Sequence, residues 1–348
     1  MGVLGATGAV GQRLVAMLER HPWFTVAEVV ASDRSAGKPY QEAANWRLES
    51  PLPEAVAQLV VKDLQTELDC DLLLSALDAS VAGPAEAAYA QAGFPVVSNS
   101  SNHRMDPDVP LLIPEVNWEH GSALPWQQRQ RGYQKGFILT NPNCSTIGLV
   151  LALKPLLDAF GVSAVQVVTM QAISGAGLDG VSAGAIQDNV IPHIGGEEEK
   201  LEMEPGKILG TFDGHGFVPA EIVVSAQCNR VAVLDGHTES VSVGLRRPAS
   251  LSEVEEAIRT FTSEPQRIKL PTAPLPPLLL SSQPDRPQPR LDRNAGSGMA
   301  VVVGRVRPCP LLDWKFTVLS HNMVRGAAGA ALLNAELLAA KGYLPEPG

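Results

Sequence analysis

The chain of 348 residues contains only four cysteines, and no two of them form a C-x-x-C pair. This scarcity argues against a disulfide framework and against a zinc site. The sequence also lacks any apolar run close to the roughly 18 residues that a membrane span needs. At the N-terminus there is no charged segment followed by a cleavage site, so no secretory signal is expected. Together these absences predict a cytoplasmic protein without a membrane partner.

Positive charge is also in short supply. Lys and Arg number 27 against 37 Asp and Glu, which gives a formal net charge of −10. A chain of this sign is a poor partner for nucleic acid. Any anionic substrate must therefore be captured by local Arg and Lys side chains, against the overall field. The apolar content of 45% is ordinary for a soluble globular protein, and the length allows two domains.

One cysteine, Cys144, stands in a chemically suggestive setting, Asn141-Pro142-Asn143-Cys144-Ser145-Thr146. A strand-like run, 136–139, precedes this stretch, and a longer apolar run, 147–153, follows it. Asn-Pro is a turn signal, and Ser or Thr before an apolar run indicates a helix start. We therefore expect Cys144 at a helix N-terminus, where the peptide dipoles and free N–H groups favour the thiolate. The other cysteines are expected to be structural: Cys70, Cys228 and Cys309.

The chain opens with a dinucleotide-binding pattern. A short strand, 1–4, leads into Gly5-Ala6-Thr7-Gly8-Ala9-Val10-Gly11 and then into a helical segment, 12–20. Glycines in this strand–turn–helix context let the backbone approach a pyrophosphate at the helix N-terminus. The alternative is a simple tight turn. Cofactor contacts are assigned to Gly5, Thr7, Gly8, Ala9, Val10 and Gly11.

The end of the next strand, 25–31, indicates which dinucleotide is bound. It runs into Ser32-Asp33-Arg34-Ser35, where a nicotinamide-binding fold meets the adenosine ribose. Asp33 alone would suggest NAD, but Arg34 flanked by Ser32 and Ser35 is a phosphate-binding set and favours NADP. The alternative is a solvated polar loop.

Further polar residues follow strand-like segments. Ser75, Asn99 and Arg104 come after apolar runs, at positions where open parallel sheets bind ligands; the alternative for Arg104 is a solvated side chain. Glu197 and Lys200 share a helix face, although an ordinary exposed pair has the same spacing. Segment 271–290 carries seven prolines and is expected to be an extended loop.

Two later residues are candidates for chemistry. His237 has a side chain suited to acid–base work, although most histidines have structural or surface roles. Arg230 lies seven positions earlier, and the sequence alone does not bring either residue to Cys144. Between 174 and 180 the glycine density marks a loop that a ligand or another backbone approaches closely.

The stretch 141–146 resembles the active-site signature of aspartate-β-semialdehyde dehydrogenases, in the form found in the archaeal and fungal branch. The resemblance covers nearly the whole chain. It includes the opening turn, the tip 31–38, Gln171 in Gln171-Ala172-Ile173-Ser174-Gly175, the acidic run closed by Lys200, Arg230 with His237, and Asn322. Several independent motifs in one order are far more specific than any one of them.

The resemblance implies a role for each matching residue. Cys144 would be the nucleophile, His237 the acid–base group and Gln171 the residue that positions the acyl group. Arg230 would bind the substrate carboxylate, and Glu197 or Glu198 would assist at its amino end. The phosphate would be held by Arg104, Asn143 and Lys200. Further cofactor contacts are assigned to Ser75, Ala76, Ser174, Gly175 and Asn322.

The expected fold class is α/β, with a Rossmann-type parallel-sheet nucleotide domain and an α+β substrate and dimerisation domain. The resemblance implies that 1–142 and 322–348 form the first domain and 143–321 the second. It also implies NADPH-dependent reduction of aspartyl phosphate to aspartate semialdehyde by a homodimer or homotetramer, without a metal. Two alternatives stay open: a malonyl-CoA reductase or another acyl-CoA or acyl-phosphate reductase on the same fold, and a non-catalytic NADP-binding protein.

Overall fold

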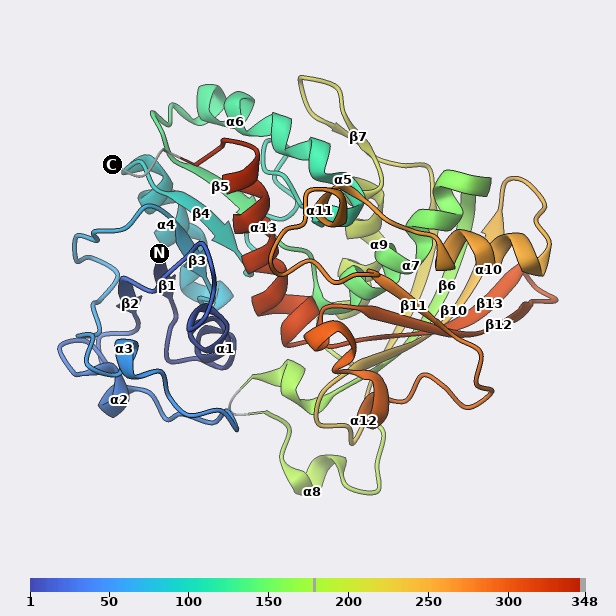
Figure 1. Ribbon diagram of the computed structural model, residues 1–348, viewed down its shortest axis with the longest axis horizontal. Helices are drawn as coiled ribbons and strands as arrows, with labels where there is room; N and C mark the ends of the chain where they lie inside the picture. Colours follow the sequence, from blue (N-terminus) through green and yellow to red (C-terminus); the bar gives the residue numbers. More distant parts are fainter. Residues whose placement is uncertain (178–179, 345–348) are drawn as a thin grey trace.

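The computed structural model describes residues 1–177 and 180–344, so Leu178 and Asp179 of the predicted glycine-rich loop and the last four residues of the predicted first domain lie outside it. Two sheets lie side by side, with helix α13 between them in the view of Figure 1. The first sheet is built from the N-terminal part of the chain and the second from the C-terminal part.

The first sheet is parallel and has the strand order β2-β1-β3-β4-β5. Its strands are β1 (Gly2–Leu4), β2 (Glu28–Val30), β3 (Leu73–Ser75), β4 (Pro95–Ser98) and β5 (Phe137–Thr140). Alternate apolar residues cover opposite faces, as a buried parallel sheet requires. One face packs on α1 (Ala9–Leu18) and α13 (Gly329–Ala340), and the other packs on α4 (Ala79–Gln91). The predicted Rossmann-type fold class is confirmed.

The strand order reverses between β1 and β3, and such a switch point is where open α/β sheets bind ligands. The first turn lies there. Gly5 has a φ of +74°, and a Cβ on Gly11 would lie 2.2 Å from the carbonyl oxygen of Gly5. These two positions therefore accept no larger side chain without rearrangement.

The second sheet is mixed, with the order β11-β12-β13-β10-β6-β9. Its strands are β6 (Val162–Gln171), β9 (Val223–Arg230), β10 (His237–Leu245), β11 (Leu278–Ser281), β12 (Val301–Pro308) and β13 (Trp314–Ser320). One face packs on α7 (Cys144–Phe160) and α10 (Leu251–Arg259). Helix α9 (Glu197–Ile208) lies against β9 and α7. A small hairpin is formed by β7 (Thr211–Phe212) and β8 (Phe217–Val218).

Short helices occupy the connections. They are α2 (Tyr40–Ala43), α3 (Glu54–Ala57), α5 (Pro114–Asn117), α6 (Leu124–Arg131), α8 (Ala183–Ile186), α11 (Glu264–Arg267) and α12 (Pro289–Asp292). The prediction of an extended loop over 271–290 was wrong in part, because this segment holds β11 and α12. Strand β11 pairs in parallel with β12 at the sheet edge, a long-range partner that a local proline count does not show.

The last helical segment has two parts. Asn322 lies in a turn before η4 (Val324–Ala328), a single π-helical turn, and α13 follows directly. Asn334 on α13 donates a hydrogen bond to the side chain of Asn141, at 2.6 Å. The end of the chain thereby packs onto the nucleotide sheet, beside the stretch that carries Cys144.

Candidate active site

A cavity of about 490 Å³ opens at the carboxyl edge of the parallel sheet, between that sheet and the second one. It collects side chains from regions that are far apart in the sequence. The predicted residues that line it are Val10, Arg104, Asn143, Cys144, Gln171, Gly175, Glu197, Lys200, Arg230 and Asn322.

Cys144 is the first residue of α7, as the sequence predicts. Asn143 caps this helix, because its side-chain oxygen accepts hydrogen bonds from the backbone N–H groups of Ser145 and Thr146. The back of the cysteine is closed by Gly326 of η4, where a Cβ would lie 2.6 Å from the Cβ of Cys144. The thiol is therefore held against the wall of the cavity.

His237 lies directly behind the sulfur and is fully buried. Its Nε2 is 3.3 Å from Sγ of Cys144, and its Nδ1 accepts a hydrogen bond of 3.0 Å from the backbone N–H of Ala172. A neutral imidazole has one N–H and one acceptor nitrogen. Because Nδ1 is the acceptor, the proton sits on Nε2 and points at the sulfur.

This environment corrects the expectation of a ready thiolate. Burial raises the pKa of Cys144 to about 12, and the negative charge of Glu197 raises it further, while Arg104 and Arg230 oppose the rise. Burial also lowers the pKa of His237 to about 3, and Arg230 adds to that effect. The helix N-terminus is present, but desolvation outweighs it, so the ligand-free pair is thiol and neutral imidazole.

Glu197 is the centre of a hydrogen-bond network on the cavity wall. Its carboxylate accepts from the side chains of Asn143 at 2.9 and 3.0 Å, Gln171 at 3.2 Å and Lys200 at 2.9 Å. Burial raises the pKa of Glu197, but the charge and hydrogen bond of Lys200 outweigh it and hold the pKa below its ordinary value. The group is ionised and orients the predicted residues around it.

Glu198 does not join them. Its carboxylate accepts a hydrogen bond of 2.9 Å from the backbone N–H of Cys228 on β9. Successive residues of a helix point about 100° apart, so only one of two neighbouring glutamates faces the cavity. The structure thus separates the two predicted positions in favour of Glu197.

Helix α9 contributes two residues that we did not predict, Glu204 and Lys207. Glu204 accepts hydrogen bonds from the guanidinium of Arg104 at 2.9 Å and from the backbone N–H of Asn143 at 2.7 Å. Lys207 donates to the backbone oxygens of Arg104 and Asp106, both at 2.7 Å. The signal was available, since Glu197, Lys200, Glu204 and Lys207 follow the helical spacing of a single face.

Arg230 enters the cavity from the end of β9. One of its guanidinium nitrogens donates to the carbonyl oxygen of Ala172 at 2.7 Å. A Cβ on Gly175 would lie 3.0 Å from that guanidinium and 3.2 Å from the ring of His237. The predicted close approach at the glycine-rich loop is therefore an approach of side chains to Gly175.

Comparisons with known proteins agree with this arrangement. Residues 1–123 match the family model of the semialdehyde dehydrogenase NAD binding domain, and residues 153–325 match that of the dimerisation domain. The aspartate-semialdehyde dehydrogenase of Archaeoglobus fulgidus is 49% identical over 97% of both chains, and that of Candida albicans is 48% identical over 99% and 98%. The crystal structure of the Candida albicans enzyme with NADP, 46% identical and covering 98% of both chains, superposes with a TM-score of 0.91.

The chain belongs to the aspartate-semialdehyde dehydrogenase family. The archaeal and fungal resemblance of segment 141–146 is confirmed, because the similar proteins include members from archaea and fungi. Among the described residues, none of the helices combines the length and apolar character needed to cross a bilayer.

The nucleotide edge fits the NADP that this family implies. Gly8 caps α1 with no side-chain hydrogen bond, so the first N–H groups of the helix are available to a pyrophosphate. In the predicted 2′-phosphate set at the tip after β2, Ser32 and Arg34 are exposed and Ser35 is half-buried. Lys38 donates there to the backbone oxygen of Arg34 at 3.0 Å. Cationic side chains at this tip suit a phosphate better than a bare hydroxyl.

Not every predicted cofactor residue presents its side chain to this edge. The hydroxyl of Ser75 donates to buried Glu86 at 2.6 Å, so Ser75 serves the packing of α4, and the residues after it, 77–79, line the cavity instead. Ala76 lies beside the first turn, its carbonyl oxygen 2.5 Å from a Cβ built on Gly5. The hydroxyl of Ser174 accepts from Asn322 at 2.9 Å.

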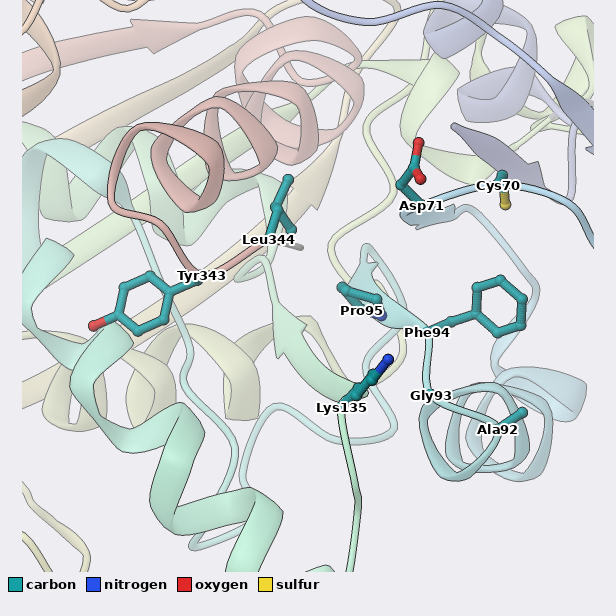
Figure 2. A pocket seen from close by; sticks show the side chains of 9 residues that line it. All are labelled: Cys70, Asp71, Ala92, Gly93, Phe94, Pro95, Lys135, Tyr343 and Leu344. Carbon is teal, nitrogen blue, oxygen red and sulfur yellow. The ribbon is translucent and has the colours of Figure 1, made fainter. Parts of the chain in front are cut away.

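A separate pocket lies at the opposite, amino edge of the parallel sheet (Figure 2). Its residues precede β3, β4 and β5 or follow α13, and they include Cys70, Asp71, Phe94, Lys135 and Tyr343. Burial raises the pKa of Cys70 to about 11, with a smaller effect from the neighbouring acids. The thiol is therefore neutral at physiological pH, in agreement with the structural role expected for it.

Proposed function

We propose that this protein is an aspartate-semialdehyde dehydrogenase that converts L-aspartyl 4-phosphate into L-aspartate 4-semialdehyde with NADPH, in the biosynthesis of lysine, threonine and methionine. The observation that carries the proposal is the pairing of Cys144 with His237, at 3.3 Å, in a cavity that also holds Arg104, Lys200 and Arg230. A thiol in one cavity with three cationic side chains suits a substrate with a carboxylate at one end and an acyl phosphate at the other.

Substrate binding follows from the charges in the cavity. Arg230 presents a planar guanidinium, which can grip the substrate carboxylate through two parallel hydrogen bonds. Arg104 and Lys200 face the phosphate, with Asn143 beside them. The ionised Glu197 attracts the ammonium group, and Gln171 fixes the acyl group from the same network.

The first chemical step is acyl transfer. The sulfur of Cys144 attacks the acyl carbon and its proton passes to the departing phosphate, while the C–S bond forms and the C–O bond to phosphate breaks, giving a thioester and free phosphate. His237 presents Nε2 to the sulfur and to the acyl oxygen beside it, and the hydrogen bond from Ala172 keeps the ring in this orientation. The position of Nε2 makes His237 the proton-exchanging group of the site.

When bound, NADPH supplies the hydride that reduces the thioester to a thiohemiacetal. During this reduction Nε2–H of His237 donates its proton to the acyl oxygen. Cys144 then leaves as a thiolate as the C–S bond breaks and the aldehyde forms, and Nε2 takes the hydroxyl proton back. Gly326 and the cap at Asn143 hold the sulfur in one position throughout.

The test is reduction of NADP by aspartate semialdehyde, measured at 340 nm with inorganic phosphate, with coenzyme A, or with neither acceptor. We expect turnover with phosphate only, and none in Cys144→Ala. Turnover with coenzyme A in place of phosphate would favour an acyl-CoA reductase, the main alternative on this fold. Absence of turnover with either acceptor in a folded, NADP-binding protein would favour a non-catalytic role.

We further propose that 1–142 with 322–348 forms the nucleotide domain, that 143–321 forms the catalytic and dimerisation domain, and that the protein acts in the cytoplasm as a homodimer or homotetramer. Supporting this, the dimerisation family model covers 153–325, and α13 packs on the parallel sheet. Light scattering after size exclusion will distinguish the two assemblies, and a monomer would contradict both.

A further inference from the structure

A second cavity, of about 570 Å³, lies on the other side of η4 from the active site. Helix α1 forms one wall with Arg13, and the turn after α12 forms another with Arg293. His321 and Val324 close the third side. The helices near these residues, α1, α12 and α13, can be followed in Figure 1. Among the residues that the structure describes, none lines both cavities.

The lining of this second cavity carries an excess of positive charge, and one of its buried hydrogen-bond donors has no partner among the described residues. Arg13, Arg47 and Arg293 line it, against the acids Glu49 and Asp235. Arg13 Nε is buried and has no hydrogen-bond partner within the described part of the chain. A buried donor without a partner is costly, so an acceptor that reached it would be stabilised.

His321 gives an independent indication of a ligand. Its side chain is 4% exposed, it lines the cavity, and its Nδ1 has no hydrogen-bond partner among the residues described. Burial lowers the pKa of His321 to about 4, Asp235 opposes this, and Arg13 and Arg293 add to it. The ring is thus neutral near pH 7, when the arginines carry the positive charge. Two ring nitrogens with one proton offer either a donor or an acceptor to a bound group.

Residues 321–327 lie between the two cavities, since His321 and Val324 line the second one and Met323 and Gly326 line the first. The carbonyl oxygen of His321 accepts hydrogen bonds from the N–H groups of Val324 and Gly326, at 3.2 and 3.0 Å. Val324 faces the second cavity, and Gly326 closes the back of Cys144. A shift of His321 would therefore be passed through η4 to the sulfur.

A second connection runs through the chain next to Asp235. This residue lines the second cavity, and His237 of the active site comes two positions later. The residue between them, Gly236, donates its backbone N–H to the side chain of Asn322 at 2.8 Å. Residues 235–237 and 321–326 thus connect the lining of the second cavity to the catalytic pair along the chain.

We propose that this second cavity is a regulatory site for a small organic polyanion, bearing carboxylate or phosphate groups, that acts on Cys144 and His237 through η4. Arg13 and Arg293 bind the charged groups, and His321 contributes a hydrogen bond. The ligand changes the reactivity of the thiol without entering the substrate cavity.

Binding is tested by calorimetry with two probes, citrate as the carboxylate and pyrophosphate as the phosphate. We expect at least one probe to bind the wild type and to bind Arg13→Gln/Arg293→Gln at least about tenfold more weakly, because charge-assisted hydrogen bonds are the strong ones. Arg290→Gln is the control, because it makes the same kind of substitution at an exposed arginine of α12; its change of charge equals that of Arg13→Gln alone. If the double variant does not melt cooperatively, Arg13→Gln alone replaces it.

Arg104→Gln separates this site from the substrate cavity, and we expect it to retain probe binding. Loss of binding in Arg104→Gln alone, equal binding in the double variant, or no binding of either probe to the wild type would each overturn the proposal. Because calorimetry does not depend on turnover, these outcomes stand apart from the test of the proposed function.

The coupling has its own measurement, the rate at which iodoacetamide alkylates Cys144. The bound probe should change this rate severalfold in the wild type and leave it unchanged in Arg13→Gln/Arg293→Gln. An unchanged rate in a wild-type protein saturated with the probe would overturn the regulatory part of the proposal.

Discussion

At the scale of single residues, the chemistry depends on which atoms of the cavity carry protons. Sγ of Cys144 faces an N–H of His237 rather than an acceptor nitrogen, because Ala172 occupies the other side of the ring. The nearest carboxylate to influence the thiol is that of Glu197. In the ligand-free protein these surroundings stabilise the thiol, and a bound substrate that engages Glu197 would relieve part of that effect.

We predict that alkylation of ligand-free Cys144 is slow at pH 7 and accelerates with pH. The thiolate is the reactive species, and below its raised pKa its fraction grows about tenfold for each pH unit. Glu197→Gln should accelerate alkylation at pH 7, because removing the negative charge lowers the pKa of the thiol. The measurement is the iodoacetamide rate from pH 6 to 10, with Glu198→Gln as the matched control. A rate that does not vary with pH would mean that the thiolate is already formed.

A second residue-scale prediction concerns Glu239, a fully buried group whose two carboxylate oxygens have no hydrogen-bond partner in the described part of the protein. Burial raises its pKa well above the ordinary value. The folded protein then keeps a proton that the unfolded chain loses above about pH 4.5, so this group makes stability fall as pH rises, by up to about 1.4 kcal/mol per pH unit. Glu239→Gln should abolish that contribution.

The measurement is the free energy of unfolding of wild type and Glu239→Gln between pH 4 and 8. We expect the two proteins to be similar at pH 4 and the variant to be more stable at pH 7. Exposed Glu199→Gln is the control. A variant that is less stable than the wild type at pH 7 would show that the carboxylate is charged and paired.

At the scale of elements, α9 organises the substrate cavity. One face of this helix carries Glu197, Lys200, Glu204 and Lys207, and each of them bonds to the cavity wall or to the loop behind it. Glu204 links Arg104, from the first part of the chain, to the backbone just before Cys144. The helix thereby fixes the distance between Arg104, the proposed phosphate-binding residue, and Cys144, the proposed nucleophile.

We therefore predict that Glu204→Gln raises the KM for phosphate, measured in the oxidative direction, more than it changes the melting temperature. The loss of a hydrogen bond to a charged group costs about 1.5–3 kcal/mol, which corresponds to roughly ten- to a hundredfold in kcat/KM. Glu202→Gln, exposed on the same helix and bonded to β9, is the matched control. Equal kinetics in the two variants would show that Arg104 is held by its other contacts.

Segment η4 allows a further prediction at this scale. Gly326→Ala places a methyl group 2.6 Å from the Cβ of Cys144, so either the helix or the cysteine must move. A misplacement of about 1 Å at a reacting atom can cost about a hundredfold in rate, and overpacking typically costs 1–3 kcal/mol. We expect kcat to fall far more than stability does. Gly184→Ala, which has open space around it, should leave kcat unchanged.

At the scale of the whole molecule, the fold class and the family could be predicted from the sequence, because both are indicated by local sequence patterns. Gly5, Gly8 and Gly11 indicate a strand–turn–helix unit, and Asn143 beside Cys144 indicates the capped start of a helix. Both patterns can be recognised without knowledge of the tertiary structure. The features that could not be predicted from the sequence depend on residues that are far apart along the chain. Strand β11 forms only against β12, and Glu204 matters only because Arg104 lies a hundred positions earlier.

The choice between Glu197 and Glu198 illustrates the same limit. Both belong to one acidic run, and only the packing of α9 on β9 decides which of them faces the cavity. The protonation state of Cys144 could not be predicted from the sequence for a different reason. The desolvation of a group depends on all the atoms packed around it, and these are known only from the structure. Motifs thus predict which residues form the site, but the atoms packed around these residues determine their protonation states.

The last helical segments have a consequence for synthesis. The surroundings of Cys144 are completed by residues near the C-terminal end. Asn322 bonds to Ser174, Gly326 lies against the back of Cys144, and Asn334 bonds to Asn141. A nascent chain on the ribosome therefore exposes that cysteine without its wall for the time needed to translate nearly two hundred more codons. Until those codons are read, the thiol is open to oxidants and lacks its partner geometry. The order of the elements thus delays activity until both sheets are joined.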